Sequence, residues 1–65
     1  MPTKQQILDA VENGQDVYWK TIAYKIIPHE SGPMIKNLGN GHMIKLIQPK
    51  TGHFNIDPKD IWIEN

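Results

Sequence analysis

The chain has 65 residues, with seven lysines balancing seven acidic residues, and it contains no arginine and no cysteine. A chain of this length forms one domain, residues 1–65, and buries only about 60% of the surface that its unfolded form exposes, so we expect modest stability. The lack of cysteine excludes disulfides, thiol catalysis and cysteine-ligated zinc, and is typical of a reducing compartment. No apolar stretch has the length of a signal-peptide core or of a membrane span, which needs about 18 residues. We therefore expect a cytoplasmic protein that does not enter a membrane.

The charges are unevenly distributed along the chain. Residues 1–19 contain one lysine and three acids, residues 20–50 five lysines and one acid, and residues 51–65 one lysine and three acids, which gives net charges of −2, +4 and −2. A basic middle between acidic ends is typical of a solvated sheet whose charge is balanced by its flanks. A positively charged binding face is the alternative that this pattern leaves open.

The first element in chain order is a helix over residues 3–13. Thr3 is a favourable N-cap, and Gln6 follows it three residues later, which completes a capping box. Apolar residues then recur at helical spacing on one stripe: Ile7, Leu8 and Val11. Gly14 follows, and glycine is the residue that most readily adopts the left-handed conformation in which helices end.

The segment "VYWKTIAYKII", residues 17–27, is the densest apolar run, and its alternation breaks in the middle. The buried set is odd-numbered at the start and even-numbered at the end: Val17 and Trp19, then Ile22, Tyr24 and Ile26. A one-residue slip sends every later side chain to the opposite face, so a bulge or tight turn belongs near residues 20–21. We predict one strand near 16–19 and a second near 22–28, with Trp19 and Tyr24 both pointing inward.

A loop over residues 28–33, "PHESGP", precedes a hairpin around Asn40-Gly41. Asn-Gly is the strongest short hairpin signal, because a type I′ turn needs positive φ at both central positions. A two-residue turn would place Lys36 opposite Lys45, whereas a three-residue turn would place Lys36 opposite Ile44.

The last third of the chain completes the predicted sheet. Residues 49–52, "PKTG", favour a turn, and residues 53–56, "HFNI", favour a short strand. Asp57 and Pro58 predict a helical turn, with the aspartate as cap and proline at the first position, before a last strand in "DIWIE". The whole pattern predicts an α+β fold: one N-terminal helix packed on a small antiparallel sheet or SH3-like half-barrel of about five short strands, with the sheet region in residues 16–65.

Lysine recurs between apolar residues on the predicted strands, in three triplets: Ala23-Lys25-Ile27, Met34-Lys36-Leu38 and Met43-Lys45-Ile47. One explanation is that lysine stems cover apolar surface while their ammonium groups stay in water. The other is a half-apolar, positively charged sheet face that receives a partner's acidic surface, an anionic ligand or a second copy of the chain. Lys36 and Lys45 directly opposite one another would cost stability, which favours the second explanation if the turn has two residues.

The five aromatic residues divide between the core and the surface. In so small a domain most of them belong to the core, and we expect this of Trp19 and Tyr24. Tyr18 opposes Trp19, and Trp62 opposes its two isoleucine neighbours, so these two are the aromatics that we expect to contact a partner. The predicted binding residues are Tyr18, Lys25, Lys36, Met43, Lys45 and Trp62.

The chain contains no recognisable catalytic constellation, and we expect neither enzymatic activity nor a cofactor. The three histidines lie 13 and 11 residues apart, which matches no local ligand spacing, so we predict no metal site. The "HES" at 29–31 lies in a proline-flanked loop, without the strand–turn–helix setting of a nucleophile elbow. The "GNG" at 39–41 is a hairpin turn rather than a phosphate loop, since no helix follows it.

Nucleic-acid binding is disfavoured, although small sheets with lysines and aromatics are one of its usual scaffolds. The net charge is zero, whereas basic domains are the expected footprint of nucleic-acid binding. Arginine, the residue best suited to bidentate contacts with bases and phosphates, is absent from the sequence.

A wider pattern covers most of the chain: "ILDAVENGQDVYW", "AYKII", the Asn-Gly turn, "HMIKLI", "TGHFN" and "DIWIE". It resembles small uncharacterised proteins of tailed phages and prophages, whose recurring pattern is a helix, G-x-x-V-x-W, A-Y-x-V/I, N-G…I-x-L and an ending like D-F-F-I-E. Here the ending departs from the double aromatic, and the lysines are not part of that pattern. The resemblance implies a phage or mobile-element protein in a bacterial cytoplasm and carries over no catalytic residues. Small phage proteins of this kind often inhibit or modulate host machinery, including defence systems.

Together these observations predict a non-enzymatic binding module of a phage or mobile element. We expect it to modulate or inhibit a host protein by direct contact, and a homodimer is left open. One alternative is a binder of an anionic nucleotide-type ligand that uses Lys36, Lys45 and an aromatic residue. A weak single-stranded nucleic-acid binder is the other.

Overall fold

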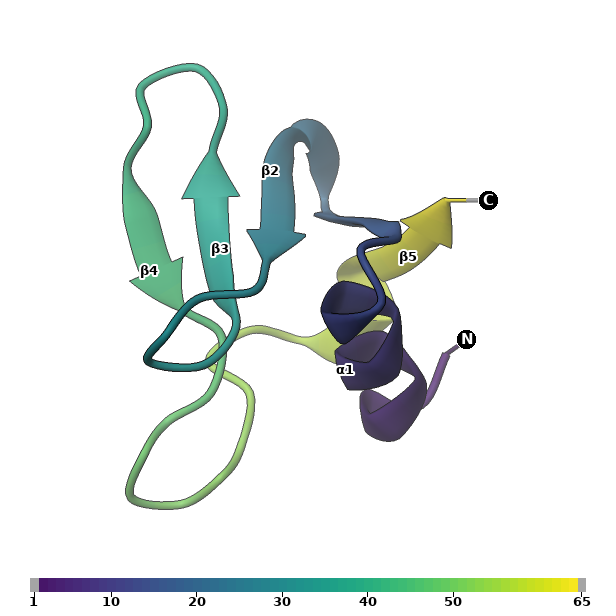
Figure 1. Ribbon diagram of the computed structural model, residues 1–65, viewed down its shortest axis with the longest axis vertical. Coiled ribbons are helices and arrows are strands. Elements are labelled where there is room, and N and C mark those ends of the chain that lie inside the picture. The colour runs from purple at the N-terminus through teal and green to yellow at the C-terminus, as the bar shows by residue number, and fades with distance from the viewer. Residues whose placement is uncertain (1, 65) are drawn as a thin grey trace.

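The computed structural model describes residues 2–64 as one helix lying on a five-stranded antiparallel sheet (Figure 1). The elements in chain order are α1 (Lys4–Glu12), β1 (Asp16–Trp19), β2 (Thr21–Ile27), β3 (Met34–Asn37), β4 (Met43–Lys45), the 3₁₀ turn η1 (Pro58–Asp60) and β5 (Ile61–Glu64). The strand order is β4-β3-β2-β1-β5, so the last strand returns to lie beside the first. The sheet is open, with β4 and β5 as its edges, and the predicted α+β class is confirmed.

The ends of α1 are fixed by the residues that the sequence pattern singles out. The Thr3 hydroxyl accepts the Gln6 N–H at 3.1 Å, and the Gln6 side chain accepts the Thr3 N–H at 2.8 Å, which makes the predicted capping box. At the other end Gly14 adopts φ +80°. Its N–H bonds to Val11 C=O, while the next N–H, of Gln15, reaches back to Ala10 C=O at 2.9 Å, so two of the helix's terminal carbonyls are satisfied.

The apolar run does break into two strands, and the break lies at Lys20. This residue has φ +63°, in the left-handed region, and the pairing of β1 with β2 shifts from Tyr18–Lys25 to Trp19–Thr21. Trp19 and Tyr24 both turn to the helix side, with ring centroids 5.1 Å apart in an edge-to-face arrangement. The inward orientation expected of Ile22 is wrong: its side chain is 70% exposed, because residues 22–24 are skipped in the pairing with β1.

The hairpin between β3 and β4 has neither of the two expected registers. Asn37 N–H bonds to His42 C=O at 2.8 Å, which leaves four residues, 38–41, in the turn and places Lys36 opposite Met43. Side chains widen this turn, because Asn37 Oδ1 and Asn40 Oδ1 accept the N–H groups of Gly39 and His42, each at 2.8 Å. Leu38 N–H also bonds to Ala23 C=O on β2, which holds the end of β3 against its neighbour.

The segment between β4 and β5 departs from the expected strand at 53–56. Only an isolated bridge joins Ile47 to Phe54, through the bonds Asn55 N–H to Leu46 C=O and Gln48 N–H to His53 C=O. The Asn55 side chain also donates to Lys45 C=O. The predicted helical turn is present as η1, with the Asp57 carboxylate accepting Lys59 N–H at 3.0 Å and proline at the first position.

The core lies between α1 and one face of the sheet. Helix α1 packs over β1, with β2 and β5 at its flanks. The buried side chains are Ile7, Ala10, Val11, Val17, Ile26, Ile35, Leu46 and Ile61. The segment 46–57 joins the same side, where Lys4 Nζ donates to Gly52 C=O at 3.3 Å and lies over the Phe54 ring. Neither layer covers the opposite face of the sheet.

We call this uncovered side the open face. It carries the side chains that alternate with the core set along each strand: Asp16, Tyr18, Lys25, Ile27, Met34, Lys36, Met43, Lys45, Trp62 and Glu64. No helix among residues 2–64 is long and apolar enough to cross a membrane.

Candidate partner-binding face

Five of the six predicted binding residues form one continuous row across the sheet. The Cα pairings run from Trp62 on β5 to Tyr18 on β1, Lys25 on β2, Lys36 on β3 and Met43 on β4. Directly paired residues on neighbouring strands project to the same side, so these five side chains share the open face. The structure therefore assembles in one strip residues that lie up to 44 positions apart in the sequence.

The sixth residue, Lys45, lies on the same face in the next row. It is paired with Met34 on β3, which is paired in turn with Ile27 on β2. Two half-buried apolar side chains thus lie between Lys45 and the middle of the sheet. Lys36 lies opposite neither Lys45, as a two-residue turn would require, nor Ile44, as a three-residue turn would require. The lysines that lie directly opposite one another are Lys25 and Lys36.

An aromatic pair occupies the β1–β5 end of the row. The Tyr18 and Trp62 rings lie 5.4 Å apart between centroids and are tilted by 35°, within the range of favourable aromatic contacts. Both are half-buried although nothing covers this face, because each shields one side of the other. They present a flat, apolar surface next to the lysines.

Two lysines in the middle of the row differ in their surroundings. Lys25 Nζ lies 3.0 Å from Asp16 Oδ1, and this hydrogen bond and the aspartate's charge raise the pKa of Lys25 above its ordinary value of 10.5. Lys36 lies directly opposite, and within residues 2–64 neither Lys36 nor Lys45 forms an ion pair with an acidic side chain. The unneutralised positive charge of the open face is therefore concentrated on β3 and β4.

The open face has a basic half and an acidic half. Lysines lie on β2, β3 and β4, whereas Asp16 and Glu64 are paired with one another on β1 and β5. Apolar side chains lie between them, and Met43 at the β4 edge is 39% exposed. Mixed charge around apolar contacts is typical of a protein interface, whereas a site for a free anion concentrates one sign of charge.

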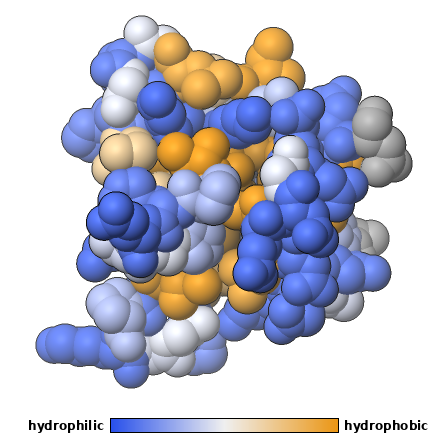
Figure 2. All heavy atoms as spheres, in the orientation of Figure 1, coloured by the Kyte–Doolittle hydropathy of each residue, from blue (hydrophilic) through white to orange (hydrophobic). Residues whose placement is uncertain are grey.

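A second exposed apolar region lies at the end of the sheet where β2 begins and β3 ends. Ile22 is 70% exposed and Leu38 53% exposed. The hydrogen bond from Leu38 N–H to Ala23 C=O brings these two segments together. Figure 2 shows apolar residues at this end of the molecule. The alternation pattern predicted Ile22 in the buried set and Leu38 beside Lys36 on the lysine-bearing face, so neither was expected in this region.

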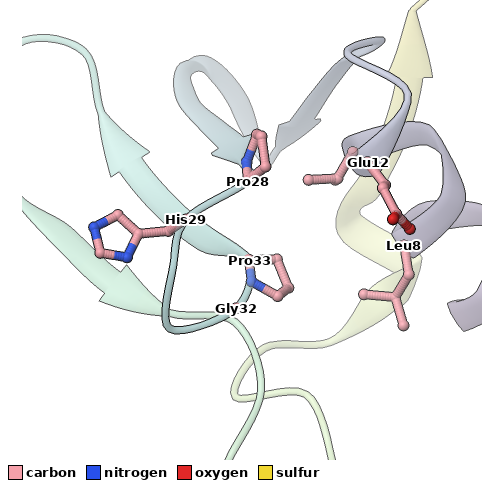
Figure 3. A pocket seen from close by; sticks show the side chains of 7 residues that line it. Leu8, Glu12, Pro28, His29, Gly32 and Pro33 are labelled. Carbon is pink, nitrogen blue, oxygen red and sulfur yellow. The ribbon is translucent and has the colours of Figure 1, made fainter.

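A hollow lined mainly by apolar side chains lies between α1 and the β2–β3 loop. It has a volume of about 360 Å³ and is lined by Leu8, Val11, Glu12, Pro28, His29, Gly32 and Pro33. Figure 3 shows the two prolines facing the helix across it, while the His29 ring points away. The His29 ring instead accepts Ser31 N–H through Nδ1 at 3.3 Å. Glu12 is the one ionisable group whose side chain borders this hollow from the helix, so no acid–base pair is assembled there.

The three histidines occupy separate parts of the structure. Within residues 2–64 no three histidine or carboxylate side chains come close enough to hold a metal ion. His42 and His53 each lie in a turn in which the backbone N–H is bonded to a nearby side chain, Asn40 and Thr51 respectively.

Comparisons with known proteins give no family to which the chain can be assigned, because no protein-family model, curated protein or solved structure matches it.

Proposed function

We propose that this chain is a non-enzymatic binding module that recognises a partner protein through its open face. The observation that carries this proposal is the row Trp62–Tyr18–Lys25–Lys36–Met43, which crosses all five strands and is covered by neither α1 nor the segment 46–57. Large aromatics, methionine and lysine stems next to one another supply apolar contact area, and unpaired lysines supply orientation. The partner surface that fits is apolar at its centre and acidic where it meets β3 and β4.

We further propose that the partner is a host protein and that the chain belongs to a phage or mobile element, acting in a bacterial cytoplasm. This part rests on the sequence pattern from "ILDAVENGQDVYW" to "DIWIE", which resembles small phage proteins. Modulation or inhibition of a host machine, including a defence system, requires only that the open face cover a functional surface of that machine. Such inhibition needs no catalytic group.

The experiment is site-specific photo-crosslinking in a bacterial host. A photoreactive phenylalanine analogue replaces Tyr18 on the open face or, as the matched control, Gln5 on the exposed side of α1. A host protein that is crosslinked from position 18 and not from position 5 is then purified and its affinity measured by calorimetry. Crosslinking of equal strength from both positions, or from neither, contradicts the proposed face.

Charge reversal tests which half of the face matters. The double variant Lys36→Glu with Lys45→Glu should keep the fold, because both side chains are on the uncovered side, and should abolish partner binding. The matched control, Lys50→Glu with Lys59→Glu, makes the same change of net charge at exposed positions outside the open face. Equal loss of binding in both variants would show a general effect of net charge, and unchanged binding in the first would remove this face as the site.

A second candidate function is capture of an anionic nucleotide-type ligand. The observation in its favour is that the Tyr18–Trp62 pair, a surface on which a base could stack, directly precedes Lys25 and Lys36 in the same row. The Asp16–Lys25 ion pair opposes it, because it removes one of the two charges that a phosphate would meet. Native mass spectrometry of protein purified from cells separates this candidate, which predicts a retained ligand, from a bare monomer or a homodimer.

A further inference from the structure

The outer edge of β5 differs from the outer edge of β4 in a way that points to a second interaction surface. We propose that β5 accepts an added strand: an extended segment of a partner protein with alternating apolar residues flanked by lysine or arginine. This surface is at an edge of the sheet and does not depend on the open face described above.

The backbone of β5 has hydrogen-bonding groups that face away from the sheet. Lys20 N–H bonds to Asp60 C=O at 2.9 Å, and this fixes Tyr18–Trp62 as the next hydrogen-bonded pair of the β1–β5 ladder. The groups of the alternate residues, Ile61 and Ile63, therefore point outward. Ile61 N–H is taken by Pro58 C=O, which leaves the Ile61 C=O and both groups of Ile63 directed at the free edge.

The other edge is shorter, and the chain itself covers its C-terminal end. Strand β4 has three residues, and its outward C=O at Lys45 accepts the Asn55 side chain at 2.8 Å. The adjoining Leu46 C=O accepts Asn55 N–H at 2.7 Å. Short strands and covered carbonyls are common ways of blocking an edge against further pairing. Within residues 2–64 no comparable side-chain contact covers the outward groups of Ile63.

The helix side of β5 has room for the side chains of an added strand. An open hollow of about 440 Å³ lies beside Ile63, between β5 and α1, and is lined by Pro2, Gln6, Asp9, Ala10, Gln15 and Ile63. A strand added to β5 would point alternate side chains into this hollow and the others onto the open face beside Trp62. Apolar residues at the inward positions would extend the core under α1.

The charges around this edge select a basic partner. Asp60 precedes the strand, Glu64 ends it and Asp9 lines the hollow, whereas the nearest lysine in sequence, Lys59, is paired with Asp57 at 3.6 Å. Basic residues at the two ends of an added strand would lie opposite these acids. A second copy fits less well, because a two-fold pairing of β5 about Trp62 would bring Asp60 of each copy opposite Glu64 of the other.

The test uses an acetylated and amidated peptide, Lys-Val-Thr-Val-Lys, titrated into the full isotope-labelled chain and followed by NMR. We expect amide shifts at Ile61–Glu64 and at Gln6 and Ala10 beside the hollow. The charge-reversed peptide, Glu-Val-Thr-Val-Glu, should bind about tenfold more weakly or not at all, because it places like charges against Asp60 and Glu64.

Proline variants locate the edge. Ile63→Pro removes an N–H that the sheet itself does not use, so it should keep the fold and abolish the shifts. Met43→Pro does the same at the β4 edge and should leave the shifts intact. Ile63→Ala, which keeps the N–H but shortens a side chain that lines the hollow, should weaken the shifts without abolishing them. Should Ile63→Pro fail to fold, a synthetic chain N-methylated at Ile63 removes only the donor.

Each other outcome overturns the proposal: absence of shifts, equal shifts with the acidic peptide, shifts at β4, or contacts between the β5 strands of two copies. The Lys36→Glu and Lys45→Glu variant separates the two proposals, since it should lose the open-face partner and retain the peptide.

Discussion

Lys25 and Lys36 lie directly opposite one another on β2 and β3, and Asp16 on the next strand lies 3.0 Å from the first of them. Like charges in a directly opposed pair are destabilising, and an adjacent carboxylate offsets the repulsion. Asp16 thus neutralises one of two adjacent lysines, which leaves Lys36 as the lysine of this pair without an acidic partner among residues 2–64.

The first prediction concerns that acid. Asp16→Asn should lower the free energy of unfolding by about 0.5–1 kcal/mol, because it removes a partly exposed ion pair and leaves the two lysines facing each other. Urea denaturation at low and high salt measures this, and the loss should shrink at high salt. Adding Lys36→Met should recover part of the loss; an unchanged loss would show that the repulsion contributes nothing.

The second prediction concerns pH. The pKa of Lys25 is raised by Asp16, so the stability that this pair contributes is present below the ordinary lysine pKa of 10.5 and is lost as the pH rises through the higher folded-state value. The difference in unfolding free energy between the wild type and Lys25→Met should therefore be constant at neutral pH and fall above about pH 10.5. Taking the difference removes the titration of other lysines and tyrosines, and a difference that stays flat up to pH 12 would contradict the assignment.

The third prediction concerns the break at Lys20. A non-glycine residue in the left-handed region is strained by about 1–2 kcal/mol. Lys20→Gly should therefore raise the free energy of unfolding by about 0.5 kcal/mol after the added entropy of the unfolded glycine is subtracted, and Lys20→Val should lower it by more than about 1 kcal/mol, since a β-branched residue tolerates positive φ least. Lys20→Ala is the control for loss of the Lys20 ammonium, which lies 5.0 Å from the centre of the Trp19 ring. Thermal or urea unfolding should rank the three variants Gly, Ala, Val in order of decreasing stability, and any other order would contradict the strain.

The fourth prediction tests the register of the hairpin. Because the sequence contains no cysteine, two introduced cysteines have no other thiol to pair with. Lys36 and Met43 form a non-hydrogen-bonded pair, whose Cα atoms lie about 4.5 Å apart in such ladders, within the range that a disulfide spans. Lys36→Cys with Met43→Cys should oxidise readily within one molecule, as seen by mass spectrometry. Lys36→Cys with Lys45→Cys, the pair that a two-residue turn would bring together, should oxidise slowly. Faster oxidation of this second pair would show that the turn has two residues.

Local signals were enough where the structure depends on neighbouring residues. The Thr3–Gln6 capping box and Gly14 fix the helix by contacts within a few positions. The switch of parity at Lys20 is visible because Trp19 and Tyr24 both pack against the core. The hairpin could not be predicted, because its length depends on side-chain hydrogen bonds of Asn37 and Asn40. The strand expected at 53–56 is reduced to a single bridge at Phe54, beside which the Asn55 side chain bonds to Lys45 C=O.

The candidate site was predicted as a set of residues but not as an arrangement. Alternation along each strand is enough to place Tyr18, Lys25 and Trp62 away from the core. Which of them touch depends on cross-strand pairing, and each pairing depends on the bulge at Lys20 and on the turn at 38–41. The row can be predicted only when the bulge at Lys20 and the length of the turn at 38–41 are both known.

The two faces of the sheet differ in what their side chains contact. Side chains such as Val17, Ile26 and Ile35 are needed to hold α1, and replacing them costs stability. Their neighbours along the same strands, Tyr18, Lys25 and Lys36, contact neither the helix nor the segment 46–57. On the proposed function, substitutions there would alter what the molecule recognises while the scaffold persists, so a chain of only 65 residues would follow a changing target without first becoming more stable.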